Sequence, residues 1–129
     1  MKTEKIFEKN GFPVVVSTEC KNINKIYPLK QKAVAGLFSA ASKHRELKRI
    51  YIFGSAVTPN CSVDSDIDIC INADTTDGMA IYNLQREIGD ICDWNCDIIM
   101  YSNMGSRLRD TINREGVIVY EQNVDNRPD

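Results

Sequence analysis

The sequence predicts a small α/β domain in which a mixed β-sheet has helices packed against it. Segments with helical periodicity alternate with short β-branched segments, and no repeat, low-complexity tract or Pro/Gly/Ser linker divides the chain. The composition, 129 residues with 43% hydrophobic and 26% charged, is that of a folded domain whose core needs no disulfide or structural metal. We therefore expect residues 1–129 to form one domain.

The first predicted elements lie before residue 50. A short helix is expected over Thr3–Lys9, and a strand over Pro13–Ser17, where three valines follow one another. A longer helix is expected from Pro28, because proline suits the first helical turn, to about Ser42. Its apolar residues recur at spacings of three and four and form one stripe. They are Leu29, Ala33, Val34, Leu37, Phe38 and Ala41.

The rest of the chain alternates strands with two helices. The first helix is capped by Thr76 or Asp77 and ends near Asp90, and the second covers Ser106–Arg114. The residues of the second helix that should face the core are Leu108 and Ile112. The predicted strands are Arg49–Phe53, Asp66–Ile71, Cys96–Met100 and Val117–Tyr120.

The sequence favours a cytoplasmic protein without a membrane segment. No apolar stretch approaches the roughly 20 residues of a membrane span, and the first ten residues mix charged with apolar side chains. The five cysteines are odd in number and scattered, which indicates reduced thiols and not a disulfide framework. Zinc is not expected, because Cys92 and Cys96 have no further ligand nearby in the sequence.

Charge is distributed unevenly although the net charge is only −2. Residues 1–50 contain 11 Lys/Arg and 4 Asp/Glu, whereas residues 51–129 contain 5 and 14. This asymmetry fits an anionic ligand near a metal-holding group of carboxylates, or two complementary surfaces, although solvated helix faces account for most lysines. Direct nucleic-acid binding is not expected, because the basic cluster at residues 43–49 lacks interleaved aromatic residues.

The stretch that indicates chemistry is Gly54-Ser55, followed after ten residues by Asp66-Ile67-Asp68. Alternate side chains of a strand share a face, so Asp66 and Asp68 project together while Ile67 turns to the core. Two adjacent carboxylates repel each other unless both are solvated or a cation lies between them. Mg²⁺ completed by substrate phosphates fits such a pair, and a glycine–serine turn offers N–H groups and a hydroxyl to phosphate oxygens.

A third carboxylate is available at Asp97, at the start of an otherwise apolar strand. If that strand neighbours the strand of Asp66 and Asp68, three carboxylates converge, which is enough for two metal ions. The plainer interpretations are a polar turn before an edge strand and a surface acid at Asp97. The glycine–serine pair at the matching distance favours the catalytic interpretation.

These residues together resemble the minimal nucleotidyltransferases, or antitoxin-type MNT domains, of the DNA polymerase beta-like nucleotidyltransferase superfamily. The family pattern is Gly-Ser, ten residues and then Asp-x-Asp, and its spacing is intact here. The resemblance extends over residues 49–121, the motif-bearing core, and leaves residues 1–27 as an N-terminal embellishment and residues 123–129 as a flexible tail. Members often have Arg and Gly where this sequence has Ala56 and Pro59.

The resemblance implies the polymerase beta-like fold and transfer of a nucleoside monophosphate, AMP from ATP first, to an acceptor hydroxyl. It implies that two Mg²⁺ ions and a nucleoside triphosphate bind at the motif. The catalytic and metal-binding residues that it implies are Asp66, Asp68 and Asp97, and the nucleotide-binding residues are Gly54, Ser55 and Ser65. It also implies a HEPN-type toxin as partner and acceptor. So short a domain leaves no room for a separate acceptor-binding domain, so we expect an acceptor that is large enough to bring its own contacts or is recruited by a partner chain.

Two alternatives stay open. One is a catalytically inactive module of the same fold that binds a nucleotide or a partner, for which Ala56 and Pro59 are the motivating departures. The other is a nucleotidyltransferase for small molecules of the aminoglycoside type. The presence of all three acids favours an enzyme over the inactive module, and the absence of a second domain argues against a small-molecule acceptor.

Overall fold

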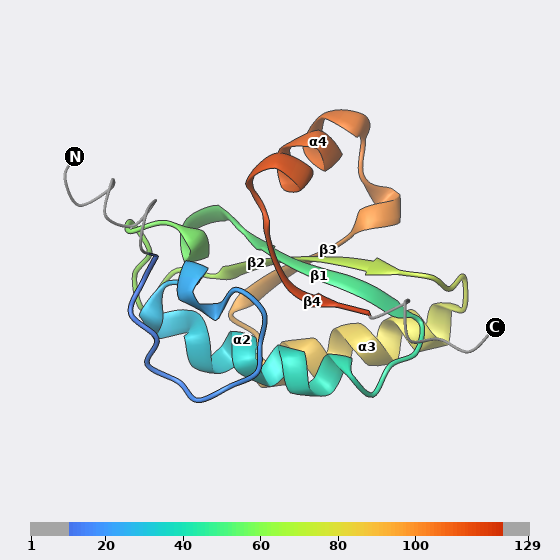
Figure 1. Ribbon diagram of the computed structural model, residues 1–129. Coiled ribbons are helices and arrows are strands. Elements are labelled where there is room, and N and C mark those ends of the chain that lie inside the picture. Colours follow the sequence, from blue (N-terminus) through green and yellow to red (C-terminus); the bar gives the residue numbers. More distant parts are fainter. Residues whose placement is uncertain (1–10, 123–129) are drawn as a thin grey trace.

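The computed structural model describes residues 11–122, which form a mixed sheet with helices on both faces (Figure 1). The strands are β1 (Leu47–Phe53), β2 (Ile67–Ala73), β3 (Cys96–Met100) and β4 (Val117–Glu121). Their order in the sheet is β3-β2-β1-β4. β1 is antiparallel to both of its neighbours, whereas β2 and β3 are parallel.

Helices connect the strands. The α-helices are α2 (Pro28–Ala41), α3 (Gly78–Ile91) and α4 (Ser106–Glu115), and the 3₁₀ turns are η1 (Ile23–Lys25), η2 (Gly54–Val57) and η3 (Tyr101–Asn103). α2 and α3 lie side by side against one face of the sheet, and α4 lies over the other (Figure 1). Among residues 11–122, no helix is both long enough and apolar enough to cross a membrane.

The two faces of the sheet bury apolar clusters of different size. The larger cluster fills the space under α2 and α3 and includes fully buried Ile50, Ile52, Ile69 and Ile71. The smaller cluster lies under α4 and consists of Tyr51, Cys70, Met104 and Ile112, with partly buried neighbours. The two central strands, β1 and β2, are covered on both faces over their middle. Apolar and polar residues therefore do not simply alternate along them. The α4 face becomes polar only toward the ends of the strands.

The predicted α/β class is confirmed, and every predicted element from residue 28 to residue 120 is present with ends shifted by at most two residues. Helix α3 is capped by the Asp77 side chain, as one of the two alternatives predicted. The inward position predicted for Leu108 is wrong, because this side chain is 39% exposed, whereas Ile112 is buried. Leu29, the first residue of the predicted apolar stripe, is 59% exposed. The helix predicted over Thr3–Lys9 and the tail at 123–129 lie outside the described residues.

The strand predicted over Pro13–Ser17 is wrong: this segment is irregular, and Val14 and Val15 are exposed. Its backbone is hydrogen-bonded by a side chain instead of a neighbouring strand. The fully buried Gln31 of α2 accepts from Val15 N–H at 2.9 Å and donates to Pro13 O at 2.9 Å and Ile26 O at 3.0 Å. One amide therefore satisfies two backbone groups of this segment, which a sheet ladder would otherwise satisfy, and one carbonyl just before α2.

The segment before α2 covers the outer edge of β4. The Asn22 amide donates to Ile118 O at 2.8 Å, and the Cys20 thiol donates to Val119 O at 3.5 Å. Ile23 and Ile26 from the same segment join the larger core. All five cysteines are free and four are buried, as the sequence predicted.

A tight C-terminal cap on α3 directs the chain into β3. Asp93 and Trp94 both have left-handed backbones, with φ of 55° and 58°. Trp94 N–H donates to Gly89 O at 2.7 Å and Asp93 N–H donates to Asp90 O at 3.2 Å, which is the bonding of a Schellman motif. The Trp94 ring lies on Gly89, where a Cβ would collide with it. This cap sets where β3 begins, and therefore where Asp97 lies.

Gln31→Leu is expected to destabilise the fold by about 2–4 kcal/mol, because it leaves Ile26 O and two further backbone groups without their partner. Chemical denaturation measures the change in the free energy of unfolding. Lys32→Leu, at the next and exposed position of the same helix, is the control and should change it by less than about 0.5 kcal/mol. Equal effects of the two variants would show that the Gln31 hydrogen bonds contribute nothing.

Candidate active site

The parallel pairing of β2 and β3 brings the predicted acids together. Asp68 on β2 is the register partner of Asp97 on β3, so the two carboxylates leave the same face of the sheet next to each other. Asp66 immediately precedes β2 and is two residues from Asp68, which places it on the same side. Ile67 and Ile69 turn to the buried face. The expectation that the two acid-bearing strands are neighbours is confirmed.

The three acids act on one another through their charges. Partial burial is the main cause that raises the pKa of Asp68, and the charges of Asp97 and Asp66 raise it further. Asp66 and Asp97 are themselves exposed. The arrangement therefore concentrates negative charge on one patch of the sheet, which we call the acid patch (Asp66, Asp68 and Asp97). The half-buried Asp68 is the member whose charged form is least favourable.

The glycine–serine pair lies directly beside Asp68. β1 ends at Phe53, the register partner of Asp68, and Gly54 follows with a left-handed φ of 72°. A Cβ at this glycine would overlap the Asp68 carboxylate, so only glycine fits both the backbone and the space. Ser55 is the second residue of the turn η2, and its carbonyl accepts from the Thr58 N–H and hydroxyl, both at 2.9 Å.

The loop between η2 and β2 is a series of tight turns. Ser65, predicted to bind nucleotide, uses its hydroxyl to accept from Ser62 N–H at 3.1 Å, and the two serine hydroxyls also lie 3.1 Å apart. Ser65 N–H donates to Ser62 O at 3.1 Å. The Ser65 side chain is thus engaged in shaping the loop that leads to Asp66.

Sequence reasoning missed Lys30, a buried residue in the first turn of α2. Its ammonium group donates to Ser65 O at 2.6 Å and to Val63 O at 3.3 Å. The available signal was its position, because a cation in the first turn opposes the helix dipole. A second link joins the start of α2 to the glycine–serine turn, where Tyr27 N–H donates to Ala56 O at 2.8 Å.

The donor set of this patch suits Mg²⁺. Across residues 11–122, no three His, Cys, Asp or Glu side chains are grouped closely enough to hold a metal by themselves. Mg²⁺ does not require such a group, since it is commonly held by one or two carboxylates with waters and substrate phosphates. The unbalanced negative charge around Asp68 and the side-chain-free approach at Gly54 both fit a cation that arrives with a triphosphate.

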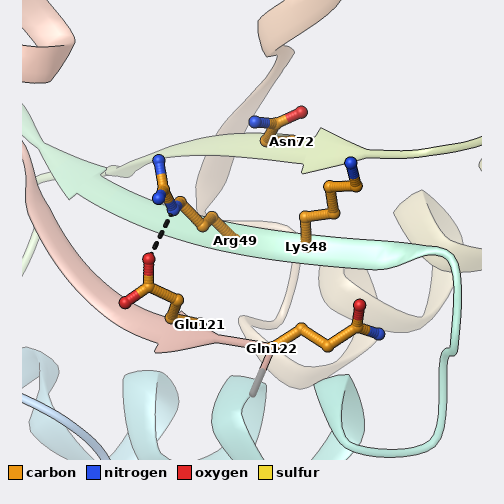
Figure 2. Close-up of a pocket in the computed structure, with 5 residues that line it drawn as sticks. All are labelled: Lys48, Arg49, Asn72, Glu121 and Gln122. Carbon is orange, nitrogen blue, oxygen red and sulfur yellow. Dashed lines mark hydrogen bonds and ion pairs between the residues drawn. The ribbon is translucent and has the colours of Figure 1, made fainter. Parts of the chain in front are cut away.

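A cavity of about 320 Å³ lies at the other end of β1 and includes none of these acids (Figure 2). It is lined by Lys48, Arg49, Asn72, Glu121 and Gln122. Arg49 donates to Glu121 at 2.7 Å, as Figure 2 shows, and Lys48 lies 3.7 Å from Asp74. These two members of the basic cluster are therefore paired with acids.

The aromatic residues near the site serve packing. Tyr101 stacks on Tyr51 with ring centroids 5.9 Å apart, and the Arg109 guanidinium lies 4.8 Å from the Tyr101 ring centre. Trp94 covers Gly89 and donates from its indole nitrogen to Asp90 at 3.0 Å. Tyr101 and Trp94 therefore both make packing contacts with their own chain.

A mixed sheet that presents three acids beside a left-handed glycine and a serine defines an enzyme class that handles phosphate groups. The family model described as polymerase beta, nucleotidyltransferase, matches residues 37–125. The chain therefore belongs to the polymerase beta nucleotidyltransferase family, and it is a nucleotidyltransferase. The resemblance noted from the sequence is confirmed.

Solved structures show the same fold. A toxin–antitoxin structure with AMP-PNP is similar with 24% identity over 72% of this chain and 74% of the other, with a TM-score of 0.54. The MntA–HepT toxin–antitoxin structure is similar with 22% identity over 71% and 73%, with a TM-score of 0.53. No curated protein matches the chain significantly in sequence.

Gly54→Ala is expected to destabilise the fold by about 1–2 kcal/mol or more, because the new methyl group requires a left-handed backbone and overlaps the Asp68 carboxylate. Denaturant unfolding measures this loss. The matched control is Gly78→Ala at the start of α3, where a Cβ has open space and alanine is neutral or slightly stabilising. Equal stability of both variants would contradict the close approach at Gly54.

Asp68→Asn is expected to raise the melting temperature by a few degrees at pH 7 with chelator present, because it removes a disfavoured charge. The folded-state pKa of Asp68 lies above its unfolded value, so the wild type gains stability as pH falls through that pKa, and the variant lacks this gain. Thermal melts between pH 7 and pH 4 measure both effects. Parallel pH profiles would rule out strain at Asp68, and Asp64→Asn in the preceding loop is the control.

Proposed function

We propose that the protein transfers AMP from ATP to a hydroxyl group in a Mg²⁺-dependent reaction. The observation that supports this most strongly is the register pairing of Asp68 with Asp97. Asp68 is two residues after Asp66 and lies beside Gly54, which has a left-handed backbone. Family membership supports nucleotidyl transfer in general, and the acid patch supports a metal-bound triphosphate as its donor. AMP-PNP in a structure of similar fold makes ATP the first nucleotide to test.

In the proposed reaction the acceptor oxygen attacks the α-phosphorus of ATP. A bond forms between that oxygen and phosphorus, the bond to the β-phosphate oxygen breaks, and pyrophosphate leaves. Asp97 is exposed at the edge of the patch and takes the proton of the acceptor hydroxyl. Gly54 and Ser55 lie where backbone N–H groups and a hydroxyl orient the phosphates. Catalysis then depends on position and charge, without a covalent enzyme intermediate.

Asp66, Asp68 and Asp97 are the residues that would hold magnesium. A bound magnesium ion would neutralise the triphosphate and stabilise the charge that develops on its oxygens. An ion held by these acids would lie next to Gly54, where no side chain would separate the phosphates from the sheet. Two ions are the stoichiometry that three carboxylates support.

The acceptor that we propose is a hydroxyl of a partner protein of the HEPN toxin type, in the cytoplasm. Similar folds occur in toxin–antitoxin structures, and this likeness in fold makes a toxin the first acceptor to test. Asp66 and Asp97 are exposed, so a macromolecular substrate is able to reach them. Five free thiols support a reducing compartment.

A second candidate is an inactive module that binds a partner or nucleotide. Ala56 favours it, because this side chain is fully buried in the core, whereas members of the family often have an arginine at this position. The phosphate-binding cation would then be absent from η2. Transfer of label from α-labelled ATP in the presence of Mg²⁺ separates the two candidates, since only the enzyme transfers AMP, and Asp66→Ala should abolish that transfer.

Asp66→Asn and Asp97→Asn are each expected to lower AMP transfer about a hundredfold or more, because each removes a charge on which the proposed site depends. Transfer of label from α-labelled ATP to the purified partner toxin measures the rate. Asp74→Asn is the control: Asp74 is exposed, lies beyond the end of β2 and pairs loosely with Lys48, so its rate should be unchanged. Wild-type rates in both site variants would refute the assignment.

A further inference from the structure

Lys30 occupies a position that stability alone does not explain. Only 7% of the residue is exposed, and it lies in the first turn of α2, where the helix dipole disfavours a cation. Removing an ammonium group from water is costly unless it is paired. Within the described part of the chain, no carboxylate lies within ion-pair distance of it, and its two hydrogen-bond acceptors are backbone carbonyls.

Those two carbonyls belong to the loop that delivers Asp66 to the sheet. The shorter contact, 2.6 Å, is to Ser65 O, which is the oxygen of the peptide group joining Ser65 to Asp66. The following peptide group is held from the other side, because Ile67 N–H donates to Asn95 O at 3.0 Å. The backbone of Asp66 is thus fixed before and after the residue, while its carboxylate is exposed.

Lys30 also lies close to the start of β3. Burial raises the pKa of the Cys92 thiol to about 12, and the charge of Lys30 acts in the opposite direction. Cys92 ends α3 just before the cap that leads to Asp97. The ammonium group therefore lies between the loop that leads to Asp66 and the end of α3, from which the chain continues to Asp97.

We propose that Lys30 is a positioning residue for Asp66, holding the Ser65–Asp66 peptide so that the carboxylate faces Asp68 where the metal–nucleotide binds. This inference rests on the proposed function. Lys30 does not touch the nucleotide; it acts through the loop carbonyls, in the way that groups behind metal ligands orient those ligands. The ligand geometry at Asp66 then depends on α2, an element that contributes no acid.

The test measures metal binding and does not depend on turnover. Mn²⁺ is titrated into the full chain with ATP present, and free Mn²⁺ is followed by electron paramagnetic resonance. Lys30→Met, which keeps the length and loses the charge, is expected to weaken apparent Mn²⁺ affinity about tenfold. Lys32→Met, exposed on the same helix, should stay within about twofold, since it touches no loop carbonyl. Lys30→Arg should retain most of the affinity.

Thermal unfolding of each variant identifies a purely structural effect. A Lys30→Met protein that unfolds cooperatively and binds Mn²⁺ as tightly as the wild type would overturn the inference, even if it melts at a lower temperature. If Lys30→Met does not fold, Lys30→Gln replaces it, with an expected affinity between those of the wild type and Asp66→Ala. Wild-type affinity in Lys30→Gln would overturn the inference equally.

Asp66→Ala separates this inference from the proposed function. Loss of Mn²⁺ binding in Asp66→Ala together with wild-type binding in the Lys30 variants would leave the proposed site intact and reject the role of Lys30. Wild-type binding in Asp66→Ala would remove the proposed site, and the inference would fall with it. Weaker binding in both, with Lys32→Met unchanged, supports both.

Discussion

The parallel pairing of β2 with β3 is the constraint on which the rest of this structure depends. Parallel neighbours cannot be joined by a tight turn, so α3 must cross one face and return the chain to the same end. The pairing sets Asp97 beside Asp68. It also makes β3 an edge, so the chain reaches the opposite edge only by passing over the other face as η3 and α4. The parallel pairing of β2 with β3 thus determines both the position of the acid patch and the packing of helices on the two faces of the sheet.

The patch stores an electrostatic cost that the apolar layers beneath it must offset. Ile67, Ile69 and Ile71 alternate with the polar positions of β2 and anchor the strand in the larger core. Asp68 can take its half-buried place because Gly54 has no side chain there, since a Cβ at Gly54 would overlap the carboxylate. Like charges kept close in this way bind a cation without rearrangement of the backbone, which lowers the entropic cost of binding.

Local patterns were enough to predict most elements and the neighbouring acids, because strand period and helix stripes are properties of short segments. The three valines at 14–16 led to the wrong prediction of a strand. A β-branched run does not show that the side chain of Gln31, in the following helix, satisfies its backbone hydrogen bonds. Leu108 was assigned inward on periodicity, yet α4 covers only the smaller cluster and leaves that side exposed. Lys30 escaped notice because its partners are carbonyls, which sequence patterns do not show.

Asp97 lies on β3, an edge strand of the sheet, and its charge has an effect there besides the one proposed for the site. Within the described residues β4 is covered by the segment around Asn22, whereas β3 has a neighbour on one side only. An unpaired edge is a template on which another copy of a protein adds a strand, and short strands with outward charges discourage this. β3 has five residues, and Asp97 is the exposed one among them. The charge that the proposed chemistry would use thereby also protects the molecule against edge-to-edge aggregation.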